Sequence, residues 1–309
     1  MMLVGRALLA SVVLCSTSGC GSVNVITSDA SAALDVPGPP RCNPLASFRT
    51  PVALTSLNTN ANDERADLSP DELTMYFSSS RSGGVGSYDI YEATRASSDT
   101  GTSFGNIIPV SGVNTAGEDR EPRVTIDGRS IFAVSRASGV PFYHITLATR
   151  TSTTLAFNGL QLVANVNGTT NDDDPYISPT GNVLYFSSDR GGNYGLYRSS
   201  STGGVFSTPT LISGVDLDSA NNEHDPVVSP DELTLYFSSD RPGGLGDFDI
   251  YEARRPTVAD GFGAPIALTS LNTPSFDVPS WISADGCVLY FTRADGNLGY
   301  QLYVATRGS

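Results

Sequence analysis

The sequence predicts an all-β fold, a five-bladed β-propeller built from four-stranded blades. Five copies of one pattern carry this prediction. Each copy holds a Ser or Thr, with an Asn or Asp eleven residues before it and an Asp or Glu six residues before it; an aromatic run and then an Arg follow. The repeated Ser or Thr positions, 56, 53, 51 and 54 residues apart, are Ser69, Thr125, Ser178, Ser229 and Ser283. A period of about 40 to 55 residues is typical of propeller blades.

Each copy is expected to form three strands, with a fourth, weaker strand in the linking segment. In the fourth copy, residues 225–229 lead through a proline-led turn into residues 233–238, an apolar and aromatic strand suited to a buried sheet. A glycine-rich loop, residues 240–246, tolerates positive φ and precedes the third strand, residues 249–253. The linking strands are expected at residues 51–54, 107–110, 160–163, 209–212 and 265–268.

The order of these linking strands predicts how the ring closes. The first lies before the first copy, and none follows the last copy after Arg307. An open array would leave residues 51–54 unpaired and the last blade one strand short. Pairing residues 51–54 with residues 301–306 removes both defects and leaves no long edge open. We therefore expect one domain, residues 47–309, in which the N-terminal strand completes blade five.

Two of the four cysteines support this closure. Cys287 follows the first hairpin turn of the fifth copy, and Cys42 lies just before the strand that should complete the same blade. Exported compartments permit disulfides, and a loop of this length would restrict the unfolded chain by about 5 kcal/mol on an entropic model. We expect a Cys42–Cys287 disulfide; two unrelated thiols are the alternative.

The N-terminal residues 1–19 are expected to be a secretory signal peptide. Arg6 supplies the positive start, residues 7–14 the apolar stretch, and small residues the cleavage site. The apolar stretch is too short for a permanent membrane-spanning helix. The chain would then be exported to a bacterial cell envelope.

A cysteine stands directly after this leader. Gly19-Cys20 resembles the bacterial lipobox, and this resemblance implies a lipid on Cys20 and a membrane-anchored lipoprotein facing the periplasm or the cell surface. Thr17 departs from the aliphatic residue usual in that motif, so an ordinary signal peptide with a chance cysteine is the alternative. Residues 20–46, rich in Ser, Ala, Asp and Pro, are expected to form a flexible tether.

The net charge is −14, and no basic stripe interrupts it. A phosphate backbone needs such a stripe, so we expect no nucleic-acid partner. We expect a monomer.

The repeats carry a family resemblance. Residues 69–77 and 229–237, Ser-Pro-Asp-Glu-Leu-Thr followed by an apolar residue and Tyr-Phe, resemble the TolB-like propeller repeat. The fuller pattern, with Tyr-Phe-Ser-Ser-Asp-Arg and Gly-Gly-x-Gly-x-x-Asp-Ile-Tyr, is similar to the variant found beside OmpA-like peptidoglycan-binding domains. The resemblance covers residues 50–307 and implies the fold; by analogy it favours a protein-binding role.

The acids six residues before each repeated Ser or Thr are the first candidate site. In a propeller they would gather near one mouth of the channel, where mutual repulsion would favour a cation or a basic partner. The alternative is a set of solvated acids that shape the loops. Carboxylates suit Ca²⁺, although no EF-hand or RTX spacing occurs, so we assign no metal ligands and no cofactor. These acids are Asp63, Asp119, Asp172, Glu223 and Asp277.

Breaks in the repetition are the second candidate. His224 stands where other copies have Glu, Arg, Asp or Val, and Trp281 stands where they have Asp, Arg, Tyr or Val. The chain has only two His and no Gly-x-Ser-x-Gly motif, so no catalytic residues are assigned.

Two functions follow. The first is a lipid-anchored, non-enzymatic propeller that presents an acidic face to a protein or envelope ligand, with a cationic partner expected. The alternative is a carbohydrate-active hydrolase that uses two of the carboxylates.

Overall fold

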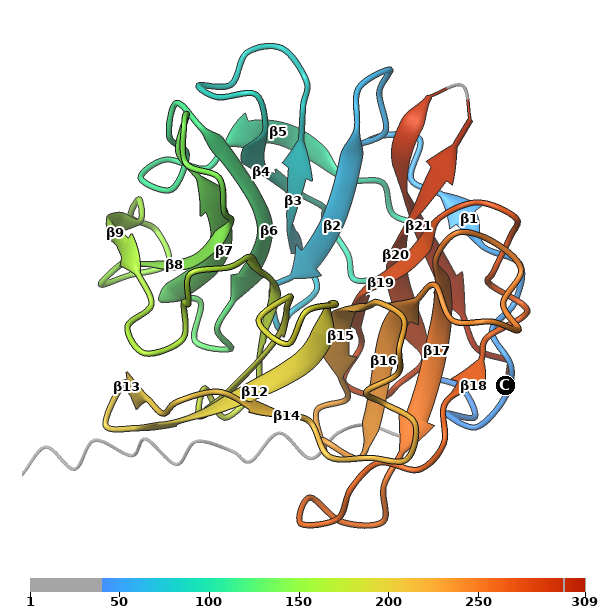
Figure 1. The fold of residues 1–309 in the computed structure, drawn as a ribbon. Helices are drawn as coiled ribbons and strands as arrows, with labels where there is room; N and C mark the ends of the chain where they lie inside the picture. The colour runs from blue at the N-terminus through green and yellow to red at the C-terminus, as the bar shows by residue number, and fades with distance from the viewer. Residues whose placement is uncertain (1–40, 297, 309) are drawn as a thin grey trace, which may run out of the picture. The chain divides into compact units, whose positions relative to one another are not determined.

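The computed structural model describes residues 41–296 and 298–308, and within them five antiparallel sheets are arranged around a central axis (Figure 1). The predicted five-bladed β-propeller is confirmed. The signal peptide, Cys20 and most of the expected tether lie outside the described residues. Among the described residues, no helix is long and apolar enough to cross a membrane.

Blades one, two and four each contain four consecutive strands. Blade one comprises β2 (Asp63–Leu68), β3 (Thr74–Ser79), β4 (Asp89–Thr94) and β5 (Gly105–Pro109). Blade two comprises β6 (Glu118–Val124), β7 (Ser130–Arg136), β8 (His144–Thr149) and β9 (Asn158–Leu162). Blade four comprises β15 (Glu223–Val228), β16 (Thr234–Ser239), β17 (Asp249–Arg254) and β18 (Ile266–Ala267).

Blade three carries one strand more than the repeat predicts. Its path runs through β10 (Asp172–Ile177), β11 (Val183–Ser188) and β12 (Gly195–Thr202). The end of β12 folds back on β13 (Val205–Phe206), while the expected linking strand, β14 (Thr210–Leu211), pairs with the start of β12. The additional hairpin arises because β12 continues past the point where the third strands of blades one and four end.

Blade five closes the ring as predicted. It contains β19 (Asp277–Ile282), β20 (Val288–Asp295) and β21 (Gly299–Thr306), and its outer strand is β1 (Val52–Ala53). Val52 pairs with Val304, and Ala53 pairs with Tyr303. Figure 1 shows the blue β1 beside the red β21. The first strand of the domain therefore protects the edge of the last blade.

The predicted disulfide is also confirmed and fastens this closure. Cys42 and Cys287 are bonded, with their Cα atoms 5.7 Å apart. Next to the bond, Arg41 pairs with Asp285 of blade five at 2.8 Å and with Glu72 of blade one at 2.9 Å. The end of the segment expected to be a tether is thus attached to two blades.

The core lies between the blades, because each second strand buries both of its faces. Tyr76 packs in a cluster with Ile131 of blade two, whereas the adjacent Phe77 packs in a cluster with Tyr290 and Leu302 of blade five. Alternate side chains of a strand point to opposite faces. In blade one, the Tyr-Phe pair that recurs in the sequence therefore joins the blade to both of its neighbours.

Two of the repeated polar positions have structural roles. The side-chain amide of Asn114 donates to the Ile90 carbonyl oxygen and accepts from the Ile90 N–H, so it clips the linking segment to β4. The Ser69 hydroxyl accepts the N–H of Thr74 at 2.9 Å and closes the hairpin between β2 and β3. The spacing recognised in the sequence thus marks contacts that hold the linking segments and the hairpins in place.

Candidate functional site

The five acids predicted at the channel mouth are buried. The end of the channel at which the innermost strands β2, β6, β10, β15 and β19 begin is called the top face. Each of the five acids is the first or second residue of its innermost strand, and each has an exposed fraction of 0%. The five are Asp63, Asp119, Asp172, Glu223 and Asp277.

Each acid holds together the loop that precedes it. Asp63 accepts the N–H of Thr59 at 2.6 Å and the hydroxyl of Ser79 at 2.6 Å, and it pairs with Arg81 at 2.5 Å. The same arrangement joins Glu223 to Arg241 at 3.0 Å and Asp277 to Arg293 at 2.6 Å. The charge of these carboxylates is therefore matched inside the protein.

Blade two departs from this arrangement. Its loop arginine, Arg136, pairs with Glu118 at 2.6 Å, whereas Asp119 accepts the hydroxyl of Ser135 and the N–H of Thr115. Burial raises the pKa of Asp119. This acid is buried without a bound arginine.

The polar side chains that gather around the channel lie two residues further along the innermost strands. Every innermost strand is bulged at this point. In four blades the residue at this place has a left-handed backbone, with φ between 53° and 57°. Residues other than glycine rarely adopt this conformation, and each such residue costs about 1–3 kcal/mol. Blade five has Pro279 at the equivalent place. The four residues are Arg65, Glu121, Asp174 and Asp225.

These four side chains form a buried ionic cluster. The Arg65 guanidinium lies 3.0 Å from Asp225, 3.7 Å from Asp174 and 3.8 Å from Glu121. Two of its nitrogens, Nε and Nη1, make no hydrogen bond within the described part of the chain. The Asp174 carboxylate also faces His224, whose Nδ1 lies 3.0 Å away. One arginine is thus shared by acids from three other blades.

The environments of neighbouring carboxyls push their pKa values in opposite directions. Burial and the nearby Asp174 raise the pKa of Glu121 to about 7. Burial and the charge of Glu121 also raise the pKa of Asp173 well above its usual range. Burial alone would raise the pKa of Asp174, but the hydrogen bond with His224 and the charge of Arg65 bring it below its usual range. The surroundings therefore move the pKa values of the adjacent residues Asp173 and Asp174 in opposite directions.

A small pocket opens from this cluster. Its volume is about 150 Å³, and Arg65, Arg120, Glu121, Tyr143, Asp173, Asp174 and His224 line it. Arg120 is paired with Glu64 at 2.7 Å, and the Tyr194 hydroxyl donates to Asp173 at 2.7 Å. Every acid lining the pocket has a hydrogen-bonding or ion-pairing partner, and two arginines face three carboxyls there.

A series of aromatic side chains lies near this pocket, and one of them, Tyr143, lines it. In every blade the residue just before the third strand or at its start is aromatic, and each of these rings is half-buried: Tyr88, Tyr143, Tyr194, Phe248 and Tyr300. His224 lies between Tyr194 and Phe248, at centroid distances of 4.0 and 5.5 Å. Phe276 joins Phe248 to Tyr300, at 5.6 and 5.0 Å. Arg120 stacks over Tyr88 at 4.5 Å. Together, these six residues form what we call the aromatic ring: Tyr88, Tyr143, Tyr194, Phe248, Phe276 and Tyr300.

Of the two asymmetric positions, only His224 belongs to this site. Trp281 lies four residues beyond Asp277 on β19 and contacts Tyr290 at a centroid distance of 5.8 Å. It packs against the core cluster that contains the disulfide. The structure therefore separates the two side chains.

Two further repeated features of the sequence mark this site. The first is the aromatic residue just before the third strand or at its start, which occurs in all five copies. The second is the polar residue two positions after each repeated acid, which occurs in four copies and is replaced by Pro279 in the fifth. Arg65 stood outside every candidate set, since nothing local indicates that one arginine would reach carboxylates of three other blades.

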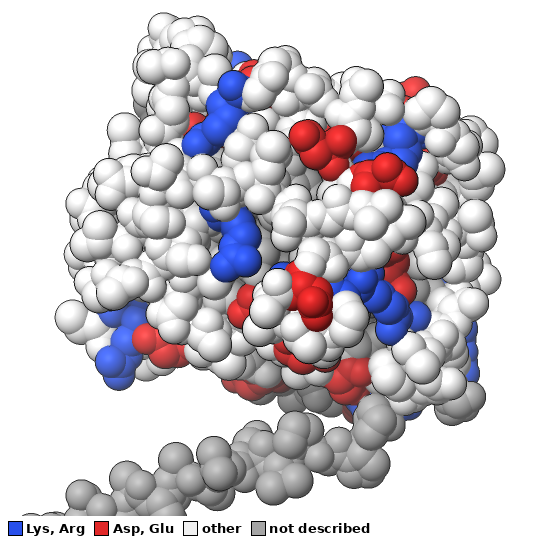
Figure 2. Space-filling view, turned by 60° about the horizontal axis from the view of Figure 1, so that its bottom comes forward, with Lys and Arg blue, Asp and Glu red and all other residues white. Residues whose placement is uncertain are grey.

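Metal binding has no arranged ligand set in residues 41–296 and 298–308, where no group of three or more His, Cys, Asp or Glu side chains could hold an ion. Charged side chains are also mixed on the surface. Figure 2 shows a face on which acidic and basic residues lie beside one another in small groups, separated by uncharged residues.

No family model matches the sequence, and no curated protein matches it either. Solved structures match the fold. A thermostable family-43 glycoside hydrolase aligns with a TM-score of 0.55 and 11% identity over 83% of this chain and 92% of that one. A GH62 hydrolase in complex with xylotriose aligns with a TM-score of 0.53 and 12% identity over 85% of this chain and 97% of that one.

TolB from Acinetobacter baumannii also aligns, with a TM-score of 0.47 and 15% identity over 81% of this chain. The chain spans 56% of the length of that TolB structure. At such identities the hydrolase likeness extends to the propeller fold alone, which binding proteins and enzymes both use.

Proposed function

We propose that this protein is an exported, non-enzymatic binding propeller, anchored by a lipid on Cys20, that captures an envelope glycan at the mouth of its channel. The disulfide supports export, because such bonds persist in oxidising compartments. The observation that carries the proposal is the aromatic ring beside a polar pocket lined by two arginines and three carboxyls.

The chemistry of the pocket favours a ligand rich in hydroxyl groups. Glu121 and Asp173, whose pKa values burial raises, offer carboxyl oxygens that accept hydrogen bonds. The Nη1 of Arg65 makes no hydrogen bond among the described residues. Aromatic rings contact the apolar faces of sugars, and a few convergent polar groups orient such ligands. The cationic partner expected from the net charge of −14 stays a prediction at this site.

Titration calorimetry with soluble cell-wall glycan fragments tests the proposal. We expect Phe248→Ala and Tyr300→Ala each to weaken binding roughly tenfold, the loss of one good aromatic contact. Val205→Ala, on an exposed strand of blade three, is the control and should bind as the wild type does. Absence of binding by the wild type, or equal binding by the aromatic variants, contradicts the proposal.

A glycoside hydrolase is the second candidate, favoured by one observation. Asp173 and Asp174 are adjacent acids whose pKa values move in opposite directions, as an acid–base pair requires. A pocket of about 150 Å³ is smaller than the roughly 300–1,000 Å³ usual for ligand sites, which weighs against it. If the protein is a hydrolase, Asp173→Asn abolishes release of reducing sugar while the glycan still binds.

A further inference from the structure

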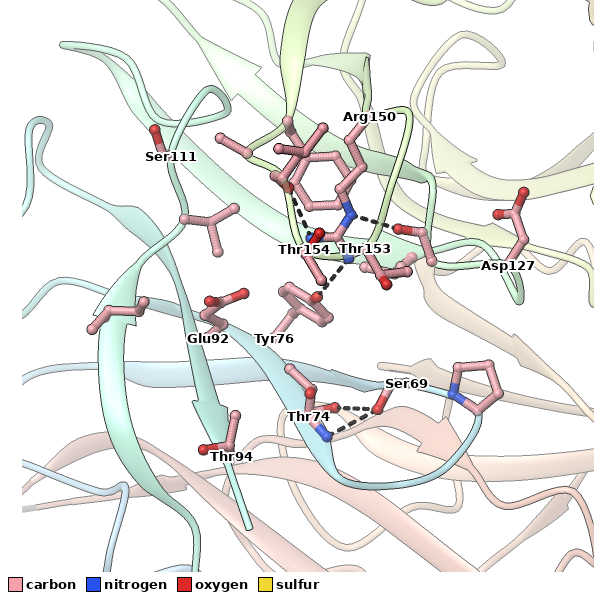
Figure 3. Close-up of a pocket in the computed structure, with 18 of the residues that line it drawn as sticks. Ser69, Thr74, Tyr76, Glu92, Thr94, Ser111, Asp127, Arg150, Thr153 and Thr154 are labelled. Carbon is pink, nitrogen blue, oxygen red and sulfur yellow. Dashed lines mark hydrogen bonds between the residues drawn. The ribbon is translucent and has the colours of Figure 1, made fainter.

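A second hollow lies away from the channel, at the junction of blades one and two. Its volume is about 660 Å³. Strands β3 and β4 and the end of β5 form one wall, and the β6–β7 turn and the loop after β8 form the other (Figure 3). We call it the one–two groove. Three exposed apolar side chains lie on its rim: Ile108, Ile126 and Leu155.

Glu92 lies in this groove, where the charge of Arg150 acts on it without forming an ion pair. Its register partner across the sheet is Tyr76, and within the described residues no hydrogen bond or ion pair reaches its carboxylate. Burial raises the pKa of Glu92. In Figure 3 the side chains of Glu92 and Tyr76 project from blade one toward the loop of blade two that carries Arg150. A half-buried carboxylate of this kind is costly unless a cation reaches it.

The nearest arginine is already engaged elsewhere. Arg150 donates to the carbonyl oxygen of Gly128 at 2.7 Å, to that of Leu155 at 3.4 Å and to the hydroxyl of Tyr76 at 3.2 Å. It also stacks over Phe157 at 4.1 Å. These contacts hold its guanidinium in the wall of the groove, and it forms no ion pair with Glu92 among the described residues.

At the junction of blades four and five, the carboxylate equivalent to Glu92 is bound by arginine side chains. Glu252 faces Tyr236 as Glu92 faces Tyr76. There, the Arg254 guanidinium donates to Glu252 at 2.6 Å and Arg307 pairs with it at 3.0 Å. The residue in register with Arg254 on β4 is Thr94, since both pair with the first residue of the second strand. Blade one therefore has the equivalent carboxylate, Glu92, but has Thr94 in place of Arg254.

We propose that the one–two groove binds an arginine side chain of a protein partner, which reaches Glu92 as Arg254 reaches Glu252. Charge complementarity supports this occupant, because Asp71 and Asp127 also line the groove and its one arginine is engaged. The exposed rim, Ile108, Ile126 and Leu155, contacts apolar residues that flank the arginine. A guanidinium suits the site because it donates to a carboxylate through two parallel N–H groups.

The test uses a defined probe, acetyl-Leu-Arg-Leu-amide, and its citrulline counterpart, which keeps the shape and lacks the charge. Two-dimensional amide NMR of the purified full-length protein should show saturable shifts for residues around Glu92 and Ile108. The citrulline peptide should bind at least tenfold more weakly. Glu92→Gln should also weaken binding of the arginine peptide at least tenfold.

Thr94→Arg is the decisive variant, because the new side chain should occupy the groove from within and reduce binding at least tenfold. Thr149→Arg is its matched control. Thr149 has the same register on β8, but the residue in the place of Glu92 is Leu147, so this variant should bind as the wild type does.

Equal affinity of the wild type and Thr94→Arg, or shifts confined to the channel mouth, would overturn the proposal. If Thr94→Arg does not fold, unchanged binding by Glu92→Gln overturns it equally. Glycan binding at the channel mouth is a separate measurement and should be unaffected by either variant.

Discussion

Two junctions of this propeller begin from nearly the same sequence and end in different surfaces. Residues 89–93 and 249–253 are both Asp-Ile-Tyr-Glu-Ala, and the tyrosine that faces each Glu is also the same. At blades four and five, two arginines hold Glu252 and the N-terminal segment packs on Arg307 through Phe48, 4.0 Å from its guanidinium. At blades one and two, Glu92 faces an open groove.

This comparison shows that the repeated sequence specifies the structure of a blade but not the surface between blades. A single exchange, Thr94 for Arg254, removes a cation from one junction. Every positively charged side chain in this protein is an arginine, since the sequence contains no Lys. Planar guanidinium groups can stack on rings and bond carboxylates at once, and junctions built on them depend strongly on where each arginine stands.

The largest expected effect comes from removing the disulfide, because a covalent bond supports only one of the two junctions. Replacing Cys42 and Cys287 by Ser removes the bond that holds residues 42–48 against blade five. We expect the free energy of unfolding to fall by about 3–5 kcal/mol in denaturant titrations. Hydrogen exchange should quicken around Phe48 and Arg307 and stay unchanged around Tyr76. Equal quickening at both junctions would show that the closure does not act locally.

The next effect compares the two arginines that stack at the junctions. Arg307→Met strips Glu252 of a partner whose side chain is only 4% exposed, and we expect a loss of about 3 kcal/mol. Arg150→Met removes bonds to two carbonyl oxygens and one hydroxyl but no ion pair, and we expect about 1 kcal/mol. Denaturant unfolding of both variants at pH 7 would measure these two losses. Similar losses would contradict the view that the ion pair distinguishes the junctions.

The smallest expected effect is on the pH dependence of stability, which should have opposite signs for Glu252 and Glu92. Burial alone would raise the pKa of Glu252, but its bonds with Arg254 and Arg307 lower it, so its contribution to stability is present above about pH 4.5 and is lost as the pH falls through the lowered value. Glu252→Gln should therefore destabilise the protein by about 1–2 kcal/mol at pH 7 and by much less in acid.

Glu92 should behave in the opposite way. Burial raises its pKa, so the ionised form disfavours the folded state once the pH rises through the raised value. Glu92→Gln should raise the melting temperature slightly at pH 7, by less than about 1 kcal/mol in free energy, and leave it unchanged near pH 4. Melting curves of both variants at the two pH values check the signs; equal signs would mean that the two carboxylates are in similar environments.

Much of the fold was predictable because propeller blades repeat and closure follows from counting strands. The pairing of Val52 with Val304 and the Cys42–Cys287 bond could both be expected from where the linking strands and the cysteines fall in the repeat. The additional hairpin of β12 and β13 could not, because residues 203–206 interrupt the repeat with a local turn that no other copy contains.

The candidate site was predictable only in part. The repetition of Asp63 and its counterparts was visible, but their burial follows from the arginine and hydroxyl partners that the loops supply. The cluster of Arg65 with Asp174 and Asp225 joins residues 109 and more positions apart in the sequence. Such contacts depend on how the strands bulge toward the axis.

The sequence by itself determined the number of blades, their strands, the closing strand and the disulfide, because each depends on local periodicity or on the count of elements. The tertiary structure decided which charges meet. Arg65 reaches acids from three other blades only because the ring brings all innermost strands to one axis. Glu92 and Glu252, by contrast, have opposite pKa shifts partly for a local reason, because Arg254 lies two residues beyond Glu252 on the same strand, and partly because Arg307 reaches Glu252 from the end of another strand.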